Sequence, residues 1–179
     1  TPEQWELAQL MENVGQHASQ AEKVRWLRRA AQIWLGEGNQ EEAERLWGLI
    51  FHEAPSDRDL CAQLVTLGEQ KGDWARVASL LELHHSALGS DQTVGEALRL
   101  ARVYAANLED PYRAAEVLAP FELAGDSTDE IDALQFLVSL YEELGYWQRA
   151  IELSARLLPN LPEGPVKANE LSRGARILA

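Results

Sequence analysis

The sequence predicts an all-α protein in which about ten helices pair antiparallel and stack into an α-solenoid. Apolar or small residues recur with helical spacing along nearly every segment, as at Leu27, Ala31 and Trp34. No segment alternates polar and apolar residues over a run rich in Val, Ile and Thr, so no sheet is expected. The same glycine turn returns after 34 positions, from Gly38 to Gly72. A fixed period of this length, made of two helices, is typical of a helical solenoid.

Turn residues separate the expected helices in the first half of the chain. The separators are Gly36 to Asn39, Pro55-Ser56-Asp57 and Gly72-Asp73. Ser56, Asp57 and Asp73 are expected N-caps, because a short polar side chain accepts a hydrogen bond from the first helical turn. The expected helices here are 3–15, 20–36, 40–53, 57–71 and 74–88.

The second half is divided in the same way. Its separators are Gly89-Ser90-Asp91, Asp110-Pro111, Gly125-Asp126-Ser127, Gly145, and Pro159 to Pro165. Ser127 is the expected N-cap of the helix that follows it. The expected helices are 93–107, 111–123, 128–144, 147–158 and 165–178.

The small and aromatic residues of these helix pairs resemble the tetratricopeptide repeat, a 34-residue helix-turn-helix motif. Repeat 24–57 carries Leu27, Ala31, Trp34, Gly38, Ala43, Trp47 and Pro55. Repeat 131–164 carries Leu134, Val138, Tyr141, Gly145, Trp147, Ala150 and Pro162. Repeat 58–91 has Gly72, Trp74 and Val77, but Gly68 stands where an aromatic residue is usual. Repeat 94–130 has Asp110-Pro111-Tyr112 in place of the glycine turn and needs one or two inserted residues.

The resemblance implies a right-handed solenoid in which residues 1–179 form a single array. A partial repeat, 3–20, precedes the four repeats, and a partial repeat or cap helix, 165–179, follows them. Helices pack closely where one offers a small residue and the other a large one, so Ala31 should lie beside Trp47 and Ala150 beside Tyr141. Because both terminal segments match single helices of a repeat, we expect the array to continue in a longer protein.

Composition narrows the class of partner. The 179 residues are 46% hydrophobic and carry a net charge of −13. Nucleic acid is an unsuitable partner, because its phosphates are bound mainly by Lys and Arg. No apolar run reaches the roughly 18 residues of a membrane span, so no direct membrane insertion is expected. The compartment stays open between a bacterial cytoplasm and periplasm.

No catalytic, metal or cofactor site is expected. His84 and His85 point about 100° apart on a helix, so they cannot bind one metal ion as residues at i and i+4 do. We expect the histidines to be solvated or to line a groove, and Cys61 to be buried on an apolar helix face. No phosphate-binding loop, nucleophile elbow or metalloprotease motif occurs. The six tryptophans are expected mostly in the repeat core, and Trp26 is expected to be partly exposed.

In the family that the chain resembles, the first helices of the repeats line a concave groove. That resemblance assigns the groove to Arg25, Arg28, Gln32, Thr66, Glu69, Arg102, Gln135 and Ser139. The Lys and Asn set with which chaperone-binding members hold a C-terminal carboxylate is absent. Arg28, Gln32 and Arg102 are expected to hold an acidic or polar peptide.

These observations predict a non-catalytic scaffold that binds a protein or peptide through the groove. One alternative is an assembly segment of a larger bacterial machine, such as a periplasmic exopolysaccharide-secretion protein. Another is a regulatory domain joined to a second domain. Self-association through exposed solenoid ends is a further possibility, because an unstacked repeat leaves apolar surface bare.

Overall fold

The computed structural model describes residues 2–121, 123, 125–161, 164, 167 and 173. In this part of the chain all regular structure is helical and the helices pack in consecutive pairs, which confirms the predicted all-α helical-repeat class. The expected helix 165–178 lies outside the described residues, apart from two isolated positions. Clustering of backbone contacts divides the chain into two compact units, Thr1–Leu88 and Gly89–Ala179.

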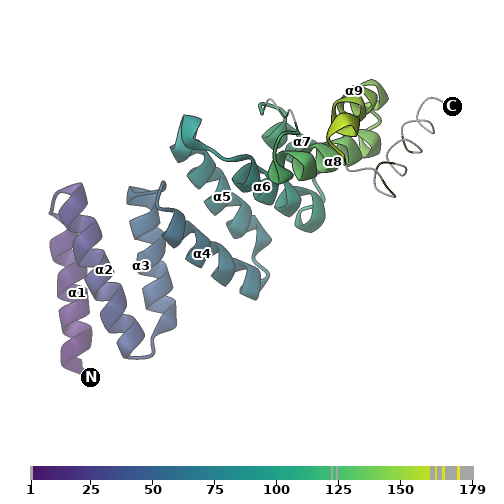
Figure 1. Cartoon of the computed structure of the whole chain (residues 1–179). Coiled ribbons are helices and arrows are strands. Elements are labelled where there is room, and N and C mark those ends of the chain that lie inside the picture. Colours follow the sequence, from purple (N-terminus) through teal and green to yellow (C-terminus); the bar gives the residue numbers. More distant parts are fainter. Residues whose placement is uncertain are drawn as a thin grey trace. The chain divides into compact units, whose positions relative to one another are not determined.

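In the first unit, each helix packs on its neighbours in the chain. The helices are α1 (Pro2–Gln16), α2 (Gln20–Gly36), α3 (Gln40–Glu53), α4 (Arg58–Lys71) and α5 (Trp74–Leu88). Figure 1 shows α1, α2 and α3 lying antiparallel, side by side. Their apolar stripes meet in a core that includes Leu27, Leu46, Ile50 and Phe51, all of which are buried.

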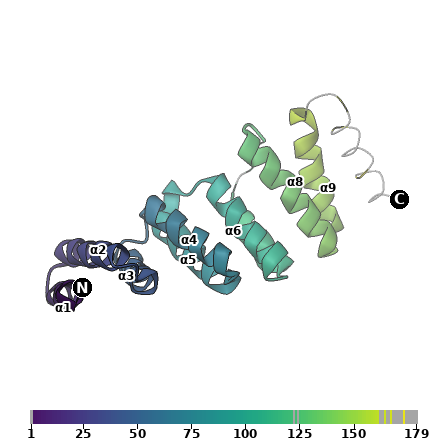
Figure 2. The same cartoon turned by 90° about the horizontal axis from the view of Figure 1, so that it is seen from below.

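The second unit begins with a short 3-10 helix, η1 (Gly89–Asp91). It continues with α6 (Val94–Asn107), α7 (Pro111–Leu118), α8 (Thr128–Glu143), α9 (Trp147–Leu157) and the 3-10 helix η2 (Leu158–Asn160). Helix α8 packs on α6, α7 and α9, and Figure 2 shows α8 and α9 side by side. Leu100, Leu118, Leu134 and Leu157 are buried in the core of this unit.

A residue with left-handed backbone reverses the chain between the two helices of a pair. Gly38, Gly72 and Gly145 hold this position, with φ of 76°, 69° and 76°. The amide of the next residue donates to a carbonyl five positions earlier: Asn39 to Trp34 at 2.9 Å, Asp73 to Gly68 at 3.0 Å, and Tyr146 to Tyr141 at 2.7 Å. This is the Schellman pattern, in which glycine is favoured because a side chain is strained at positive φ.

The turn between α6 and α7 reaches the same reversal without glycine. Glu109 takes the left-handed position with φ of 53°. The amide of Asp110 donates to Tyr104, six positions earlier, at 2.9 Å. The turn is therefore one residue longer than the glycine turns, in agreement with the insertion expected in this repeat. Asp110 then caps α7, and Pro111 fills the first helical position, where a missing N–H costs nothing.

One expected helix end and one expected N-cap were wrong. Helix α7 ends at Leu118 and not at residue 123. Pro120 explains the early end, because a proline lacks the N–H of the next helical hydrogen bond and its ring clashes with the preceding turn. Helix α4 starts at Arg58, and its N-cap is Asp57, whose carboxylate accepts from the Leu60 amide at 3.1 Å, so Ser56 is not the cap.

The unusual Gly68 has a packing reason. A Cβ added to Gly68 would lie 2.7 Å from the Cγ2 methyl of Val77. Helices α4 and α5 therefore approach most closely where the other repeats carry an aromatic residue. Val77 is fully buried, and a β-branched side chain in a helix has one strongly preferred χ1 rotamer, so it cannot move aside cheaply.

Replacing Gly68 by Ala should therefore destabilise the first unit. We expect Gly68→Ala to lower the free energy of unfolding by about 1–3 kcal/mol through overpacking. Gly48→Ala is the matched control: it lies inside α3 with open space around it, and should raise stability by about 0.5–1 kcal/mol. Urea denaturation followed by circular dichroism measures both. A neutral Gly68→Ala would contradict the close approach.

The strained turn at Glu109 predicts the opposite response. Glu109→Gly should raise the free energy of unfolding of the second unit by about 0.5–1 kcal/mol, because the relief of left-handed strain exceeds the added entropy of the unfolded chain. Gly145→Ala should lower it by about 1–2 kcal/mol at the equivalent turn. The same denaturation experiment compares the pair. Stabilisation by Gly145→Ala would show that the turn tolerates a side chain.

Candidate functional site

The predicted groove residues of the first unit lie on α2 and α4. Arg25, Arg28 and Gln32 are exposed on α2, and Arg28 donates to the carboxylate of Asp57 at 2.7 Å. Gln32 lines a cavity of about 590 Å³ between α1 and α2. Arg28 is thus already paired with an acid of its own chain.

On α4, Thr66 is exposed and Glu69 is half-buried. Thr66 donates its hydroxyl hydrogen to the Ala62 carbonyl at 2.8 Å. Thr66 also lines a mainly apolar cavity of about 400 Å³, together with Trp47 and Leu67. The structure therefore places Trp47 beside the predicted groove residue Thr66.

In the second unit, the predicted groove residues lie on α6 and α8. Arg102 is exposed, and its guanidinium lies 4.0 Å from the Asp132 carboxylate. The backbone carbonyl oxygen of Gln135 accepts a hydrogen bond from the Ser139 hydroxyl at 2.9 Å. Ser139 in turn accepts a hydrogen bond from Arg173 at 3.0 Å. Several of these polar groups are therefore already engaged within the chain, and the groove itself stays a prediction.

The expected burial of the tryptophans was wrong in two cases. Trp147 is 53% exposed and Trp5 is 49% exposed. Trp26 is partly exposed, as expected. Trp147 stands at the start of α9, and the inner face of that helix is carried by Ala150, which is fully buried. Trp5 packs one side of its ring against the buried Trp34, with centroids 5.8 Å apart.

His84 also differs from expectation. It is buried, and its Nδ1 lies 2.6 Å from the Pro55 carbonyl oxygen, so it is neither solvated nor groove-lining. The hydrogen bond to the α3–α4 connection satisfies the ring in the core. Cys61 is buried, as predicted.

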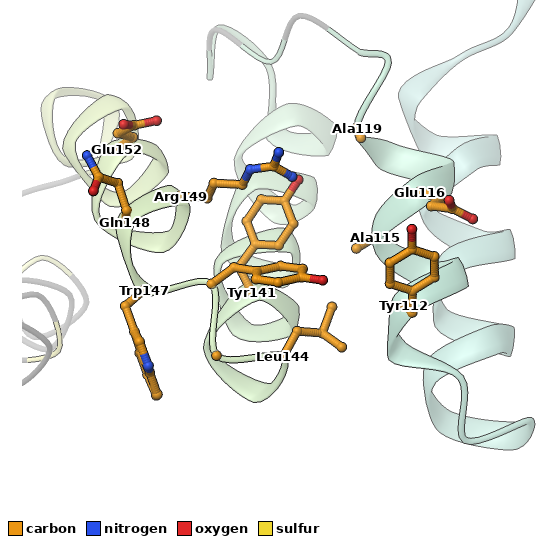
Figure 3. Close-up of a pocket in the computed structure, with 12 residues that line it drawn as sticks. Tyr112, Ala115, Glu116, Ala119, Tyr141, Leu144, Trp147, Gln148, Arg149 and Glu152 are labelled. Atoms are coloured by element: carbon orange, nitrogen blue, oxygen red, sulfur yellow. The ribbon is translucent and has the colours of Figure 1, made fainter.

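A large cavity lies in the second unit, between α7 and the turn that joins α8 to α9. Its volume is about 990 Å³. Figure 3 shows Arg149 reaching from α9 toward α7, where Tyr112 and Glu116 form the facing wall. The lining residues are Tyr112, Ala115, Glu116, Ala119, Tyr141, Leu144, Gly145, Tyr146, Trp147, Gln148, Arg149 and Glu152. We call this cavity the α7–α9 pocket.

Two tyrosine rings hold Arg149 in the α7–α9 pocket. Its guanidinium carbon lies 5.8 Å from the ring centroid of Tyr141 and 5.8 Å from that of Tyr146. The two rings meet edge to face, with centroids 6.0 Å apart. A guanidinium over aromatic faces is attracted by their quadrupoles. Both contacts restrict the guanidinium, and among the described residues none of its N–H groups donates a hydrogen bond.

Tyr112 and Glu116 act together on the opposite wall. They stand one helical turn apart on α7, and both are exposed. The negative charge of Glu116 raises the pKa of the Tyr112 hydroxyl above its ordinary value, and the hydrogen bond that Tyr112 donates to this carboxylate adds to the rise. The positive charge of Arg149 acts on the same pKa in the opposite direction. The three groups thus belong to one electrostatic site.

The start of α9 departs from the other second helices. Asn39 accepts from the Glu42 amide at 3.3 Å, Asp73 from Arg76 at 3.1 Å, and Asp110 from Arg113 at 3.0 Å. At the equivalent position of α9 stands Tyr146, which makes no side-chain cap. The Tyr146 ring instead stacks against Tyr141 and Arg149. At this position, an aromatic side chain that lines the pocket thus stands where the other helices carry a capping residue.

Sequence reasoning missed Arg149, Tyr112, Glu116 and Tyr146 as members of one site. A signal was present, because Arg149 is the first basic residue after a run from Ala114 to Gln148 that holds eight acids and no Lys or Arg. Tyr146 also broke the Asn or Asp pattern that follows the other left-handed turn residues. Neither signal shows which helices face each other, so the pocket could be identified only from the structure.

The Tyr112–Glu116 pair predicts a pKa change. Glu116→Gln should lower the pKa of Tyr112 toward its ordinary value, because the phenolate would no longer form beside a carboxylate. Glu152→Gln is the control, since Glu152 lines the pocket but does not contribute to this pKa. NMR titration of the tyrosine ring resonances measures both variants. An unchanged Tyr112 pKa in Glu116→Gln would contradict the arrangement.

Comparison with known proteins does not identify a family for this chain. No family model matches the chain, and no curated protein matches it significantly. Among the described helices, none is long and apolar enough to cross a bilayer. In the same part of the chain, no three His, Cys, Asp or Glu side chains gather as metal ligands would.

Proposed function

We propose that this chain is a non-catalytic scaffold of tetratricopeptide-like repeats that binds another protein or a peptide. The observation that carries the proposal is the α7–α9 pocket, where three large aromatic side chains stand exposed around a stacked arginine. Tyr112 is 53% exposed and Tyr146 is 42% exposed, beside Trp147. Tyr, Trp and Arg are the residues most enriched at the energetic centres of protein interfaces.

The placement of these residues supports the same function. The aromatic side chains start from helices whose inner faces are buried, as Ala115 and Ala150 show. A rigid support lowers the entropy that is lost when a partner binds. The non-catalytic part of the proposal rests on the sequence, which contains none of the nucleophile, phosphate-loop or metalloprotease motifs sought above.

The predicted groove stays part of the proposal as a second binding face. Arg28 and Arg102 would have to exchange Asp57 and Asp132 for acids of the partner. Exposed ion pairs are worth only about 0–1 kcal/mol, so such an exchange is feasible. Arg25, which is exposed on α2, would extend that face.

A specific surface favours the alternative of an assembly segment. Leu7, Leu10 and Val14 are exposed along one side of α1, at 43%, 59% and 44%. An apolar stripe with helical spacing normally packs against another helix. This face supports stacking within a larger bacterial assembly, of which a periplasmic exopolysaccharide-secretion machine is one example.

The proposed function is tested by capture and by direct binding. The immobilised chain is exposed to lysate of the source organism, captured proteins are purified, and their affinity for the chain is measured. We expect a saturable partner whose affinity falls about tenfold or more in Tyr146→Ala/Trp147→Ala, because aromatic anchors dominate interface energies.

Two further variants assign the binding face. Leu49→Ala removes an equally exposed apolar side chain of the first unit and should leave the affinity unchanged. A loss confined to Arg28→Glu/Arg102→Glu would move the partner to the predicted groove. If no captured protein binds saturably, the scaffold function is wrong.

A further inference from the structure

We propose that the α7–α9 pocket recognises a protein segment in which a single Asp or Glu side chain binds Arg149 and an adjacent aromatic or large apolar side chain packs on Tyr112, Leu144 and Tyr146. This inference rests on the proposed function and deepens it by naming the chemistry of the partner. It places recognition between second helices and not on the predicted groove.

The first step is the availability of the Arg149 guanidinium. Among the residues that the structure describes, Arg149 contacts two aromatic faces and has no hydrogen-bond acceptor or carboxylate partner. Four arginines of the chain, by contrast, have polar partners: Arg28 with Asp57, Arg45 with Glu12 and Glu42, Arg113 with the Tyr104 hydroxyl, and Arg173 with both oxygens of Glu142. Within the described part of the chain, the Arg149 donors are therefore free for a ligand.

The second step is the geometry of those donors. A guanidinium is planar and presents five N–H groups that match a carboxylate in a bidentate way. Contact with the rings of Tyr141 and Tyr146 restricts the guanidinium before a ligand arrives, so binding immobilises less of the side chain. A carboxylate gains both hydrogen bonds at once, whereas a neutral amide or hydroxyl gains weaker ones.

The third step is the apolar surface beside the charge. Leu144 lies between the α7 and α9 walls in Figure 3, and Tyr112 faces it across the pocket. The volume of about 990 Å³ is at the upper end of the roughly 300–1,000 Å³ of ligand-binding clefts. The pocket can therefore hold two neighbouring side chains of a segment, one on Arg149 and one among the aromatic rings.

The fourth step is the charge of the surroundings, which selects among anions. Two carboxylates, those of Glu116 and Glu152, also line the pocket. A phosphate carries about −1.5 to −2 charges, and a nucleic acid carries many more, so both are repelled more than a single carboxylate. A basic ligand would have to stand beside the positive charge of Arg149. A segment with one acid next to an apolar residue suits both constraints.

The test uses a phage-displayed library of random peptides, selected on the immobilised full chain. We expect the enriched peptides to share an Asp or Glu next to an aromatic or large apolar residue. The strongest peptide is then synthesised, and its dissociation constant is measured by fluorescence anisotropy against the full chain and its variants.

Arg149→Ala should weaken binding about tenfold or more. The affinity of Arg149→Lys should lie between those of the wild type and Arg149→Ala, because a lysine keeps the charge but cannot donate two parallel hydrogen bonds. Arg156→Ala is the matched control. Arg156 is an exposed arginine of the same helix outside the pocket, and its loss should change nothing. Replacing the acidic residue of the peptide by its amide should weaken binding to the wild-type chain as much as Arg149→Ala does. The same replacement should weaken binding to the Arg149→Ala variant only slightly.

The peptide substitution keeps the test decisive even if an Arg149 variant folds poorly, which circular dichroism would reveal. Equal binding to wild type and Arg149→Ala would overturn the inference while leaving the scaffold function intact, with its site on another face. Enrichment of basic peptides, or an acid-to-amide change without effect, would also overturn it. A library that yields no binder, together with a lysate that yields no saturable partner, would overturn both proposals.

Discussion

The fold depends on one local constraint, the left-handed residue that ends each first helix. At this residue the chain turns back so that the next helix can lie against the one before it. The three glycine turns close with the same hydrogen bond, and the Glu109 turn reaches the same reversal with one more residue and a strained side chain. Because the reversal is set by the backbone, the surrounding side chains can differ from copy to copy without changing the pairing of the helices.

The side chains depart most from the common pattern at the turn between α8 and α9. Tyr146 occupies the position from which Asn39, Asp73 and Asp110 cap their helices, and it gives up the cap to stack on Tyr141 and Arg149. Loss of a good N-cap typically costs about 1 kcal/mol of helix stability. Departures from local rules tend to gather at functional sites. Two features thus distinguish the pocket: its exposed aromatic side chains, and a helix start at Tyr146 that lacks a stabilising cap.

Much of the fold was predictable because it follows from local pattern. Nine of the ten expected ranges correspond to described helices, since glycine turns, N-caps and apolar spacing are properties of neighbouring residues. The early end of α7 was missed although Pro120 is visible in the sequence, because the helical period appeared to run through it. Gly68 could not be explained from sequence, since its partner Val77 becomes close only when α4 and α5 pack. The pocket was harder still, because it joins a tyrosine of α7 to an arginine of α9 across a third helix, and no periodicity relates these positions.

The repeated turn also bears on how the chain reaches its fold. Most of the helix pairs that pack follow one another in sequence, so most of the loops closed during folding are short and cost little entropy. Chains dominated by such local contacts have low contact order and fold quickly, and nucleation can begin in any helix pair. The α6–α7 hairpin is the exception, because Glu109 must enter the left-handed region before its helices can meet. Closing of this hairpin should therefore be less favourable than closing of a hairpin whose turn carries glycine.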